Sequence, residues 1–489
     1  MAFREDEDTL GTVKVPKDAH YGPQTQRSIL NFDICRKTDL MPMEVIKSLV
    51  LLKLCASKIN KSKGRLAQKE QEAIESACEE VLMNKHNHEF PLVIWQTGSG
   101  TQTNMNVNEV ISSVANTKLG KDKGSKAPVH PNDHVNCGQS SNDIIPSAIN
   151  VAVVISCIEY LLPKVTYLRD SLKKKQGEFE NFVKIGRTHL QDAVPMTFGQ
   201  ELSGYIDQID QNLDYIRGHL AHISRLALGG TAVGTGLNSF TGFDVEVCTE
   251  LTELVLSRWR KGTAFFEAFN EQFLISCSNK LEFSPAINKF AALAGHDALL
   301  VFSGMLQSLA TAFLKMASDF TLLASGPRCG FSEIILPANE PGSSIMPGKV
   351  NPTQCESMSM VAVQVMGNHQ SVAIGASRGI LELNVFKPLI ASNLIHSIKL
   401  LADSAHSFAQ HCVLDMQVNE TKMREYTERS LMLVTALSPK IGYEKSAQLA
   451  KWAEANGKSL REAVAEFKFI SLEQYDEIVN PKEMTLGGE

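Results

Sequence analysis

One segment of the chain, GSSIMPGKVNPTQCE at residues 342–356, joins an irregular backbone to a concentration of groups that bind anions. Its two glycines and two prolines disfavour a continuous helix or a central strand, so the segment is predicted to be a loop. Ser343 and Ser344 offer hydroxyl donors, Lys349 a fixed positive charge and Asn351 an amide. Together with backbone N–H groups outside regular structure, these groups are suited to bind a carboxylate or a phosphate.

Two other interpretations apply to this loop. A nucleotide phosphate loop has four residues between its glycines and a hydroxyl after its lysine, whereas five residues separate Gly342 from Gly348 and Val350 follows Lys349. That interpretation is rejected. A flexible surface loop with an incidental lysine is the alternative for the loop considered alone, and several further polar segments weigh against it.

A second polar segment, WQTGSGTQTNMNVNE at residues 95–109, gathers hydroxyl and amide side chains around two glycines and contains Ser99, Gly100 and Thr101. Capping of a helix that starts near Val107 is the structural explanation, since Ser, Thr and Asn are common caps. A cap needs only one or two such residues, so the surplus indicates a binding role.

The segment VHPNDHVNCGQSSND at residues 129–143 carries two histidines, His130 and His134, with the spacing of a helical metal pair. Pro131 disfavours a helix there and no HExxH pattern is present, so no metal site is predicted.

The same segment ends with Ser140, Ser141 and Asn142, directly before an apolar helical pattern at residues 144–176. These three side chains are therefore expected at a helix N-terminus, where free N–H groups and the helix dipole attract anions. Capping explains one of them and leaves two surplus donors.

A fourth polar segment, KIGRTHLQDAVPMTFGQE at residues 184–201, presents Thr188 and His189 in a loop bounded by glycine and proline. A lone histidine is more often structural than catalytic. The glycine-rich stretch GGTAVGTGLN at residues 229–238 allows close approach of backbone N–H groups to a ligand, although it is a weak motif by itself.

Composition sets the class of protein. The 489 residues carry a net charge of −6, with 43% hydrophobic and 21% charged residues, which is typical of a globular protein and makes nucleic acid or an anionic membrane surface an unexpected partner. The ten cysteines show no CxxC pair, so neither a zinc site nor a disulfide framework is indicated. The acidic N-terminus resembles neither a secretory signal nor a transit peptide. The apolar runs at 144–162 and 291–314 are predicted to be buried helices rather than membrane spans.

Helical periodicity predicts elements long enough to form a bundle. The expected helices are 43–62, 66–83, 144–176, 197–226, 285–325, 353–375 and 388–412. Residues 1–40 are predicted to form loops with one or two short strands, and the chain after 412 a small helical domain. Several of these helices are apolar on more than one face, so we expect them to pack in a bundle and against other subunits of an oligomer.

In order along the whole chain, these segments resemble the motifs of the fumarase/aspartase superfamily, and TGSGTQTNMNVNE, HPND, QSSND, GRTHLQDAVP, GGTAVGTGLN and LNVFKP resemble those of its class II fumarase branch. The resemblance implies a mainly α, three-domain fold with a central bundle of long helices. It also implies a homotetramer whose core is made of bundles from four subunits, with each active site built from three of them. The expected domains are 1–140 (N-terminal, α-rich), 141–412 (long-helix bundle) and 413–489 (small, helical).

The resemblance further implies a fumarate hydratase of the tricarboxylic acid cycle, a hydro-lyase that interconverts fumarate and (S)-malate without a metal or cofactor. Ser343 would be the catalytic base, His189 an acid/base group and Glu356 a support for the loop. His130, Pro131, Asn132 and Asp133 would form a second dicarboxylate site. The substrate-binding positions would be Ser99, Gly100, Thr101, Ser140, Ser141, Asn142, Thr188, Ser344, Lys349, Val350 and Asn351. The expected location is cytoplasmic, or the mitochondrial matrix if an upstream presequence is missing from this chain.

Two departures from the family pattern stand out. Cys137-Gly138 replaces a lysine and a hydroxyl residue in HVNKSQSSND, and residues 255–281 resemble an insertion whose aromatic residues either pack as an added helix or leave an exposed apolar patch. Two competing functions therefore remain: a lyase that releases an amine, such as aspartase, which Gly348 and TQCE disfavour, and a catalytically weakened paralogue kept for binding or assembly.

Overall fold

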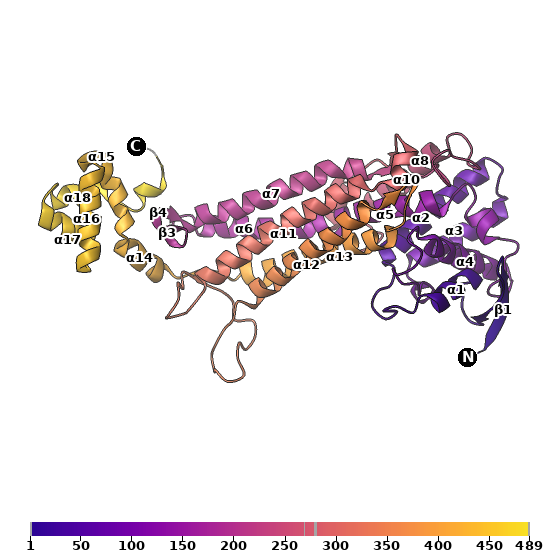
Figure 1. Cartoon of the computed structure of the whole chain (residues 1–489), viewed down its shortest axis with the longest axis horizontal. Helices are drawn as coiled ribbons and strands as arrows, with labels where there is room; N and C mark the ends of the chain where they lie inside the picture. Colours follow the sequence, from indigo (N-terminus) through magenta and orange to yellow (C-terminus); the bar gives the residue numbers. More distant parts are fainter. Residues whose placement is uncertain (1, 268, 278–280, 488–489) are drawn as a thin grey trace. The chain divides into compact units, whose positions relative to one another are not determined.

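The computed structural model describes residues 2–267, 269–277 and 281–487 and is mostly helical (Figure 1). The helices are α1 (Pro23–Asn31), α2 (Met43–Ser62), α3 (Gln68–Leu82), α4 (Thr101–Lys118), α5 (Ser141–Ser156), α6 (Leu162–Glu178), α7 (Phe198–Ile223), α8 (Phe243–Trp259), α9 (Glu271–Cys277), α10 (Lys289–Ala294), α11 (Asp297–Leu323), α12 (Thr353–Ala376), α13 (Lys387–Phe408), α14 (Glu420–Arg429), α15 (Ser438–Ile441), α16 (Tyr443–Asn456), α17 (Leu460–Phe467) and α18 (Leu472–Ile478). Short helical turns are η1 (Asn87–Glu89), η2 (Pro131–Val135), η3 (Cys157–Leu161), η4 (Ala409–Val413), η5 (Leu431–Leu437) and η6 (Glu483–Thr485).

The strands pair two by two in the described part of the chain. Antiparallel pairs are β1 (Phe3–Asp8) with β2 (Gly11–Pro16), β3 (Val183–Thr188) with β4 (Gln191–Thr197), β8 (Gly379–Ile380) with β9 (Leu383–Asn384), and β7 (Ile334–Ile335) with β10 (Gln417–Val418). The pair β5 (Arg225–Leu226) and β6 (Ser284–Pro285) is parallel.

The chain divides into two compact units. The first comprises Met1–Val165, Asn212–Ala310 and Val361–Asp403, and the second Thr166–Gln211, Thr311–Met360 and Ser404–Glu489. Five long helices, α6, α7, α11, α12 and α13, contribute residues to both units. The division into three domains near residues 140 and 412 stays a prediction.

Helix α2 is the core element of the first unit, where it packs against α3, α4, α5 and α8 (Figure 1). Leu49, Val50, Leu51 and Leu52 are all fully buried. Four successive residues of a helix point to all sides, so α2 is covered around its whole circumference. The next residue, Lys53, is fully buried as well.

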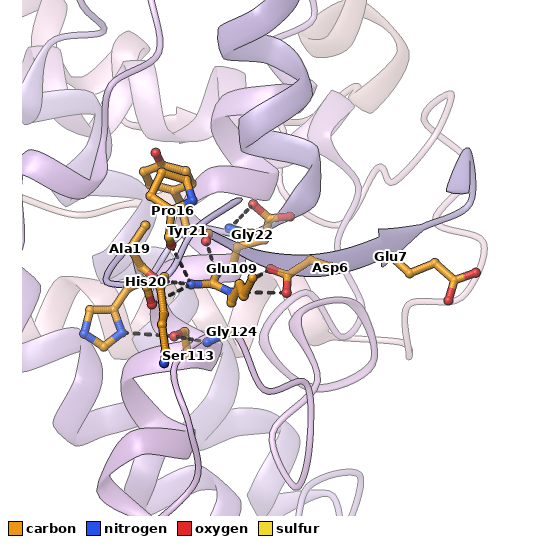
Figure 2. A network of polar contacts seen from close by, with 12 residues as sticks. Asp6, Glu7, Pro16, Ala19, His20, Tyr21, Gly22, Glu109, Ser113 and Gly124 are labelled. Carbon is orange, nitrogen blue, oxygen red and sulfur yellow. Dashed lines mark hydrogen bonds and ion pairs between the residues drawn. The ribbon is translucent and has the colours of Figure 1, made fainter. Parts of the chain in front are cut away.

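The N-terminal hairpin β1–β2 is anchored by the guanidinium of Arg4. Arg4 donates to the carboxylate of Asp6 at 3.0 Å and to the main-chain carbonyls of Pro16 at 3.0 Å, Ala19 at 2.7 Å and Tyr21 at 2.7 Å. Figure 2 shows these four residues gathered around one network. The hairpin is thereby fixed to the segment that leads into α1.

Most predicted helices form, and two differ in a way that has a local cause. The pattern at 144–176 becomes α5 and α6 joined by the π-helical turn η3. The single helix expected at 285–325 is wrong, because α10 ends at Ala294 and Gly295 adopts an extended backbone with φ −112° and ψ 155°. Asn288 caps α10 by accepting from Ala291 N–H at 2.9 Å, and α11 begins afresh at Asp297.

The predicted insertion at 255–281 is docked by the buried carboxylate of Glu159 in η3. Glu159 accepts hydrogen bonds from Trp259 Nε1 at 2.8 Å and from the backbone N–H groups of Phe265 at 2.9 Å and Phe266 at 2.8 Å. Trp259 is 0% exposed and Phe265 is 4% exposed. These aromatic residues therefore pack into the first unit, followed by the short helix α9, rather than forming an exposed patch. Residues 268 and 278–280 of the segment lie outside the described residues.

The C-terminal helices of the second unit, α15 to α18, lie together in Figure 1 and share a hydrophobic core. Leu437, Leu449 and Ala463 are fully buried in it. Trp452 and Phe467 pack against this cluster and contact each other edge to face, with ring centroids 6.0 Å apart. The small helical C-terminal segment expected after residue 412 thus has its own hydrophobic cluster.

Two helical stretches, Ser141–Glu178 and Asp297–Leu323, are long and apolar enough to cross a membrane if only length and composition are considered. In the first, 89% of the most apolar window is buried inside the protein, as expected for a core helix. In the second, α11, only 44% of the most apolar window is buried, so this helix keeps exposed apolar surface.

Candidate active site

Two helix N-termini of the first unit meet through a chain of three hydroxyl groups. Helix α4 begins at Thr101 and α5 at Ser141, and Thr101 Oγ1 lies 2.8 Å from Ser141 Oγ and 2.9 Å from Ser99 Oγ. The free N–H groups of each first turn and the positive end of each helix dipole favour a bound anion. We call this arrangement of Ser99, Thr101 and Ser141 the hydroxyl cradle.

Gly100 allows the two helices to approach. Its φ of +76° lies in the left-handed region, and a Cβ at this position would lie 2.9 Å from Cγ2 of Ile145 in α5. A side chain here would strain the backbone and push α4 away from α5. The predicted binding role of Gly100 is therefore, in this structure, to let the cradle form.

Ser140 is the cap that α5 needs. Its Oγ accepts from Asn142 N–H at 3.2 Å, and its own N–H donates to Asp143 Oδ1 at 2.9 Å, which completes a capping box. Asn142 Nδ2 donates to the carbonyl of Ala232 at 2.8 Å and so ties the glycine-rich segment to the helix. Of the three residues predicted at this N-terminus, Ser141 is the one whose hydroxyl joins the cradle.

Asp143, which the sequence did not single out, fixes the glycine-rich segment from the other side. Its Oδ2 accepts from the N–H groups of Gly229 and Thr231, each at 2.9 Å. Burial raises the pKa of Asp143 to about 6, against the opposing effect of these hydrogen bonds. The motif at 229–238 is thus held against the start of α5 by backbone contacts that only small residues permit.

Lys53 is a second residue that the sequence analysis missed. It lies in the middle of α2, with its Nζ 2.8 Å from Oδ1 of Asn104 in α4, and burial lowers its pKa to about 7. The signal in the sequence is a lysine that follows the run LVLL on a helix with no polar side.

In the second unit, Thr188 and His189 lie at the tip of the β3–β4 hairpin. Thr188 pairs with Gln191, which leaves His189 and Leu190 as a two-residue turn with φ of +56° and +60°. Left-handed conformations at both positions suit the twist of a tight hairpin, but for residues other than glycine they cost on the order of 1 kcal/mol each. The turn places the exposed imidazole of His189 at the tip of the hairpin, beyond the strands.

The hairpin is anchored beneath this tip by a buried ion pair. Arg187 donates to both carboxylate oxygens of Glu333, at 3.0 Å and 2.9 Å, and Glu333 is fully buried. Lys184 adds contacts to Glu201 at 2.9 Å and to Glu333 at 3.5 Å. A cavity of about 450 Å³ beside the hairpin is lined by Lys184, Arg187 and Leu190 among others. Arg187 is therefore committed to positioning the turn.

The segment predicted to be a loop, 342–356, is irregular and largely exposed up to Pro352, and backbone and side-chain hydrogen bonds join Gly342 to Lys349 and Asn351. Gly342 N–H donates to Lys349 O at 2.9 Å, and Asn351 Nδ2 donates to Gly342 O at 2.7 Å. Ser343 Oγ accepts from the N–H groups of Ile345 at 3.2 Å and Met346 at 3.0 Å. Two donors aimed at this oxygen stabilise negative charge on it.

The other residues of the loop are open to solvent. Lys349 Nζ has no hydrogen-bond or ion-pair partner within the described residues, and Ser344 and Val350 are exposed. Helix α12 begins directly after Pro352, as predicted, and Glu356 lies exposed in its first turn. The support of the loop by Glu356 stays a prediction.

At the expected second dicarboxylate site, the prediction that Pro131 disfavours a helix is wrong. Pro131 does not prevent a helical turn: Pro131–Val135 forms the π-helical turn η2, with proline at its first position, where no N–H is lost. His130 Nδ1 accepts from the N–H groups of Asn132 at 3.3 Å and Asp133 at 3.2 Å, and His134 Nδ1 accepts from His130 N–H at 2.8 Å. The Nδ1 atoms of both histidines thus accept from backbone N–H groups, and His130, Pro131 and Asn132 line a cavity of about 420 Å³.

The wall of this cavity includes the network around the N-terminal hairpin. Glu7 and Glu109 line it, and Glu109 accepts from Gly22 N–H at 2.9 Å (Figure 2). Lys126 Nζ donates to the carbonyl of Glu7. A cation, the start of η2, the exposed carboxylate of Glu7 and the buried carboxylate of Glu109 thus surround one space in the first unit.

The predicted site residues form two groups, one in each unit. The first unit brings together Ser99, Gly100, Thr101, Ser140, Ser141 and Asn142, with His130 to Asp133 in a separate cavity, and the second unit carries Thr188, His189, Ser343, Ser344, Lys349, Val350, Asn351 and Glu356. Throughout the described ranges, no group of three His, Cys, Asp or Glu side chains is placed to hold a metal ion.

Comparison with known proteins identifies the family. The profile of the family described as "Lyase" matches residues 11–272 and 260–367, and that of "Fumarase C C-terminus" matches residues 433–486. The chain is 53% identical to the fumarate hydratase of Schistosoma mansoni over 478 residues, which cover 98% of this chain and 96% of the relative. The chain belongs to the class II fumarate hydratase family.

A further relative and a solved structure of this family match over similar lengths. The mitochondrial fumarate hydratase of Rattus norvegicus is 50% identical over 483 residues, covering 99% of this chain and 90% of that relative. The crystal structure of recombinant class II fumarase from Schistosoma mansoni superposes with a TM-score of 0.94 at 52% identity and covers 99% of both chains. The expected fold class is therefore confirmed, and the roles of individual site residues remain predictions.

Proposed function

We propose that the protein is a fumarate hydratase that interconverts (S)-malate with fumarate and water. The observation that carries the proposal is the hydroxyl cradle, in which two helix N-termini converge in an arrangement suited to an anion. It lies in a chain about half identical to fumarate hydratases along its whole length. The substrate is a small dicarboxylate, whose charge requires such a site.

The chemistry explains why hydrogen-bond donors are needed. Dehydration of malate removes a proton from the carbon next to a carboxylate, so negative charge accumulates on that carboxylate in an aci-carboxylate intermediate. Each donor aimed at the developing charge contributes about 3–4 kcal/mol. Thr101, Ser141 and the free N–H groups of α4 and α5 are positioned for this role in the first unit.

Ser343 and His189 are proposed to move protons. The two N–H groups directed at Ser343 Oγ, together with the ammonium of Lys349 on the same loop, would stabilise the oxygen in its basic form. His189 is proposed to protonate or position the departing water from its fixed turn. Asn351 holds the loop closed through Gly342.

A homotetramer with shared active sites is part of the proposal. The two groups of site residues lie in different units of one chain, and the long helices keep exposed apolar residues, including Val301 on α11 and Met360, Val363 and Ile374 on α12. Such faces on otherwise buried helices are typical of contacts between protomers. The comparisons are compatible with both expected compartments, since some relatives carry "mitochondrial" in their names and others do not.

The test follows the ultraviolet absorbance of fumarate after (S)-malate is added to the purified protein. Turnover is expected for the wild type, with a loss of about 10²-fold or more in kcat for Ser343→Ala and for His189→Asn. Ser359→Ala, which removes a hydroxyl that donates to Cys355 O within α12, is the matched control and should keep full activity. Pure tetrameric protein that does not convert malate would refute the proposal, and release of ammonia from aspartate would instead support an amine-releasing lyase.

A further inference from the structure

The charge of Lys53 is buried without a counter-ion in contact. Its side chain is 0% exposed, and its Nζ donates to three amide oxygens: Asn104 Oδ1 at 2.8 Å, Gln139 Oε1 at 3.1 Å and Asn136 Oδ1 at 3.3 Å. No carboxylate contacts it within the part of the chain that the structure describes. Burial of an ammonium carries a large desolvation penalty, so its presence here indicates a role that an apolar residue could not fill.

The three acceptors belong to the two segments that form the hydroxyl cradle. Asn104 follows Thr101 by one helical turn in α4, and Asn136 and Gln139 lie in the turn that leads directly to Ser140. Lys53 therefore touches the start of α4 and the entry to α5 at the same time.

The acceptors are themselves linked to each other. Asn136 Oδ1 also accepts from the amide groups of Asn104 and Asn108, each at 3.2 Å, and Asn136 Nδ2 donates to the carbonyl of Gln139 at 3.1 Å. Gln139 Nε2 donates to the carbonyl of Val135 at 3.2 Å. Removal of the ammonium would leave the buried amide oxygen of Asn104 and the partly buried ones of Asn136 and Gln139 without their charged donor, so the relative position of α4 and α5 depends on Lys53.

We propose that Lys53 is a positioning residue for substrate binding: its ammonium holds the N-termini of α4 and α5 in register and supplies, from behind the hydroxyl cradle, the positive charge that the substrate carboxylate requires. This inference rests on the proposed function. According to this inference, Lys53 on the core helix α2 contributes part of the affinity for the dicarboxylate.

The protonation state of Lys53 makes the inference testable by pH. Burial lowers its pKa to about 7, and two titratable groups act on it: the carboxylate of Asp143 in α5 favours the ammonium, and Cys78 of α3 would do so only as a thiolate. From α4 and the turn at 136–139 it is faced by amides. Burial raises the pKa of the Cys78 thiol, which stays neutral, and Asp143 is ionised above about pH 6. Binding of a dianion favours the charged lysine, so KM for malate should rise as pH rises above about 7.

The experiment compares Lys53→Met with Lys47→Met in the full-length protein. Lys47 lies on the same helix, is also buried and also donates to a neutral oxygen, Phe265 O at 3.3 Å, but it faces the docked insertion. KM and kcat for malate are measured between about pH 6 and 9. For Lys53→Met we expect KM to increase about 10-fold or more below the lysine pKa, kcat to change less than about 3-fold, and the rise of KM with pH to disappear. Lys47→Met should keep the wild-type KM profile.

A second variant, Gln139→Glu, decides the question if Lys53→Met does not fold. It keeps the lysine and places a carboxylate where an amide oxygen accepts from Nζ at 3.1 Å. The ion pair should raise the pKa of Lys53, move the rise of KM by about one pH unit or more to higher pH, and weaken binding because the charge is neutralised. An unchanged KM profile in either folded variant would overturn the inference. If the wild type does not turn over malate, the proposed function fails, and binding of fumarate to the same variants, measured by calorimetry, still tests the role of Lys53.

Discussion

Single residues decide how the candidate site departs from its family. Gly138 adopts φ +75°, so the backbone at this position suits glycine and would be strained by a serine. The neighbouring thiol of Cys137 is half-buried, burial raises its pKa, and the Arg65 side chain lies beside it. A cation is thus already present where the family pattern has a lysine.

This arrangement predicts that Cys137→Lys does not improve the enzyme. The new ammonium would lie beside the guanidinium of Arg65, and like charges at short range repel. We expect kcat/KM for malate to stay within about 3-fold of the wild type or to fall.

The control for this variant is the pair Cys137→Lys with Arg65→Gln, which should recover any lost activity. A gain of about 10-fold or more from Cys137→Lys alone would contradict the prediction. Such a gain would favour the interpretation of the chain as a catalytically weakened paralogue.

Sequence motifs located most of the candidate site at this scale, because hydroxyl, amide and glycine clusters are visible as letters. The part they missed is the support. Lys53 and Asp143 act through partners far away in the chain, Asn136 and Gly229 for example, and no local pattern reveals such pairs. The different roles of Ser140, Ser141 and Asn142 could not be predicted from the sequence either. They depend on which hydroxyl caps α5 and which one contacts Thr101 at the start of α4.

At the scale of elements, the π-helical turn η3 gives the predicted insertion its place. The turn carries Glu159 between α5 and α6, where it accepts from the indole N–H of Trp259, the last residue of α8, and from two backbone N–H groups of the segment after α8. Burial raises the pKa of Glu159 to about 7 from its ordinary value of 4.5, against the effect of these donors.

The shifted pKa of Glu159 predicts a pH-dependent stability with a definite sign. A carboxyl whose folded-state pKa is raised contributes stability that is present below about pH 4.5 and is lost as pH rises through about 7. At 1.36 kcal/mol per pKa unit, the loss is about 3 kcal/mol. Glu159→Gln removes this dependence, so its Tm should gain on the wild-type Tm as pH increases across that range.

Thermal unfolding of both proteins at several pH values measures this difference. Glu253→Gln is the matched control, because Glu253 lies on α8 with an exposed side chain. A difference in Tm between Glu159→Gln and the wild type that does not change with pH would show that Glu159 is not responsible.

The limits of prediction for elements have physical causes. Helix starts after Pro42 and Pro352 were located well, because proline sets a boundary that the sequence displays. The break between α10 and α11 was missed, because the apolar spacing continues across Gly295. The π-turn η3 keeps its residues helical, so periodicity alone cannot distinguish it from the α-helix on either side.

For the whole molecule, the long helices expose apolar faces that the proposed tetramer would bury. Met360 and Val363 on α12 are 68% and 60% exposed, which is unusual for large apolar side chains on a helix that also contributes to the core. A tetramer that buries these faces would place residues of several copies in each active site, as proposed above.

We therefore predict that Val363→Arg disrupts the oligomer and abolishes activity with it. A charge in a closely packed apolar contact is strongly unfavourable, whereas the same change at an exposed site is tolerated. Sedimentation of the purified variant should show species smaller than a tetramer. Val245→Arg, on the exposed side of α8, should sediment and react like the wild type. A Val363→Arg protein of unchanged size and full activity would disprove the predicted interface.

The hydroxyl cradle has one more consequence, which concerns the direction of its protons. Each O–H group in a row of three can donate to its neighbour on either side. The hydrogen bonds that link Ser99, Thr101 and Ser141 can therefore all run in one direction along the row or all in the other. A carboxylate that accepts a hydrogen bond from the hydroxyl at one end of the row orients all three O–H groups toward itself. An alcohol that donates a hydrogen bond to the same end orients them in the opposite direction. The same three side chains thus adapt to a ligand that loses or gains a hydroxyl, without any movement of the helices that carry them.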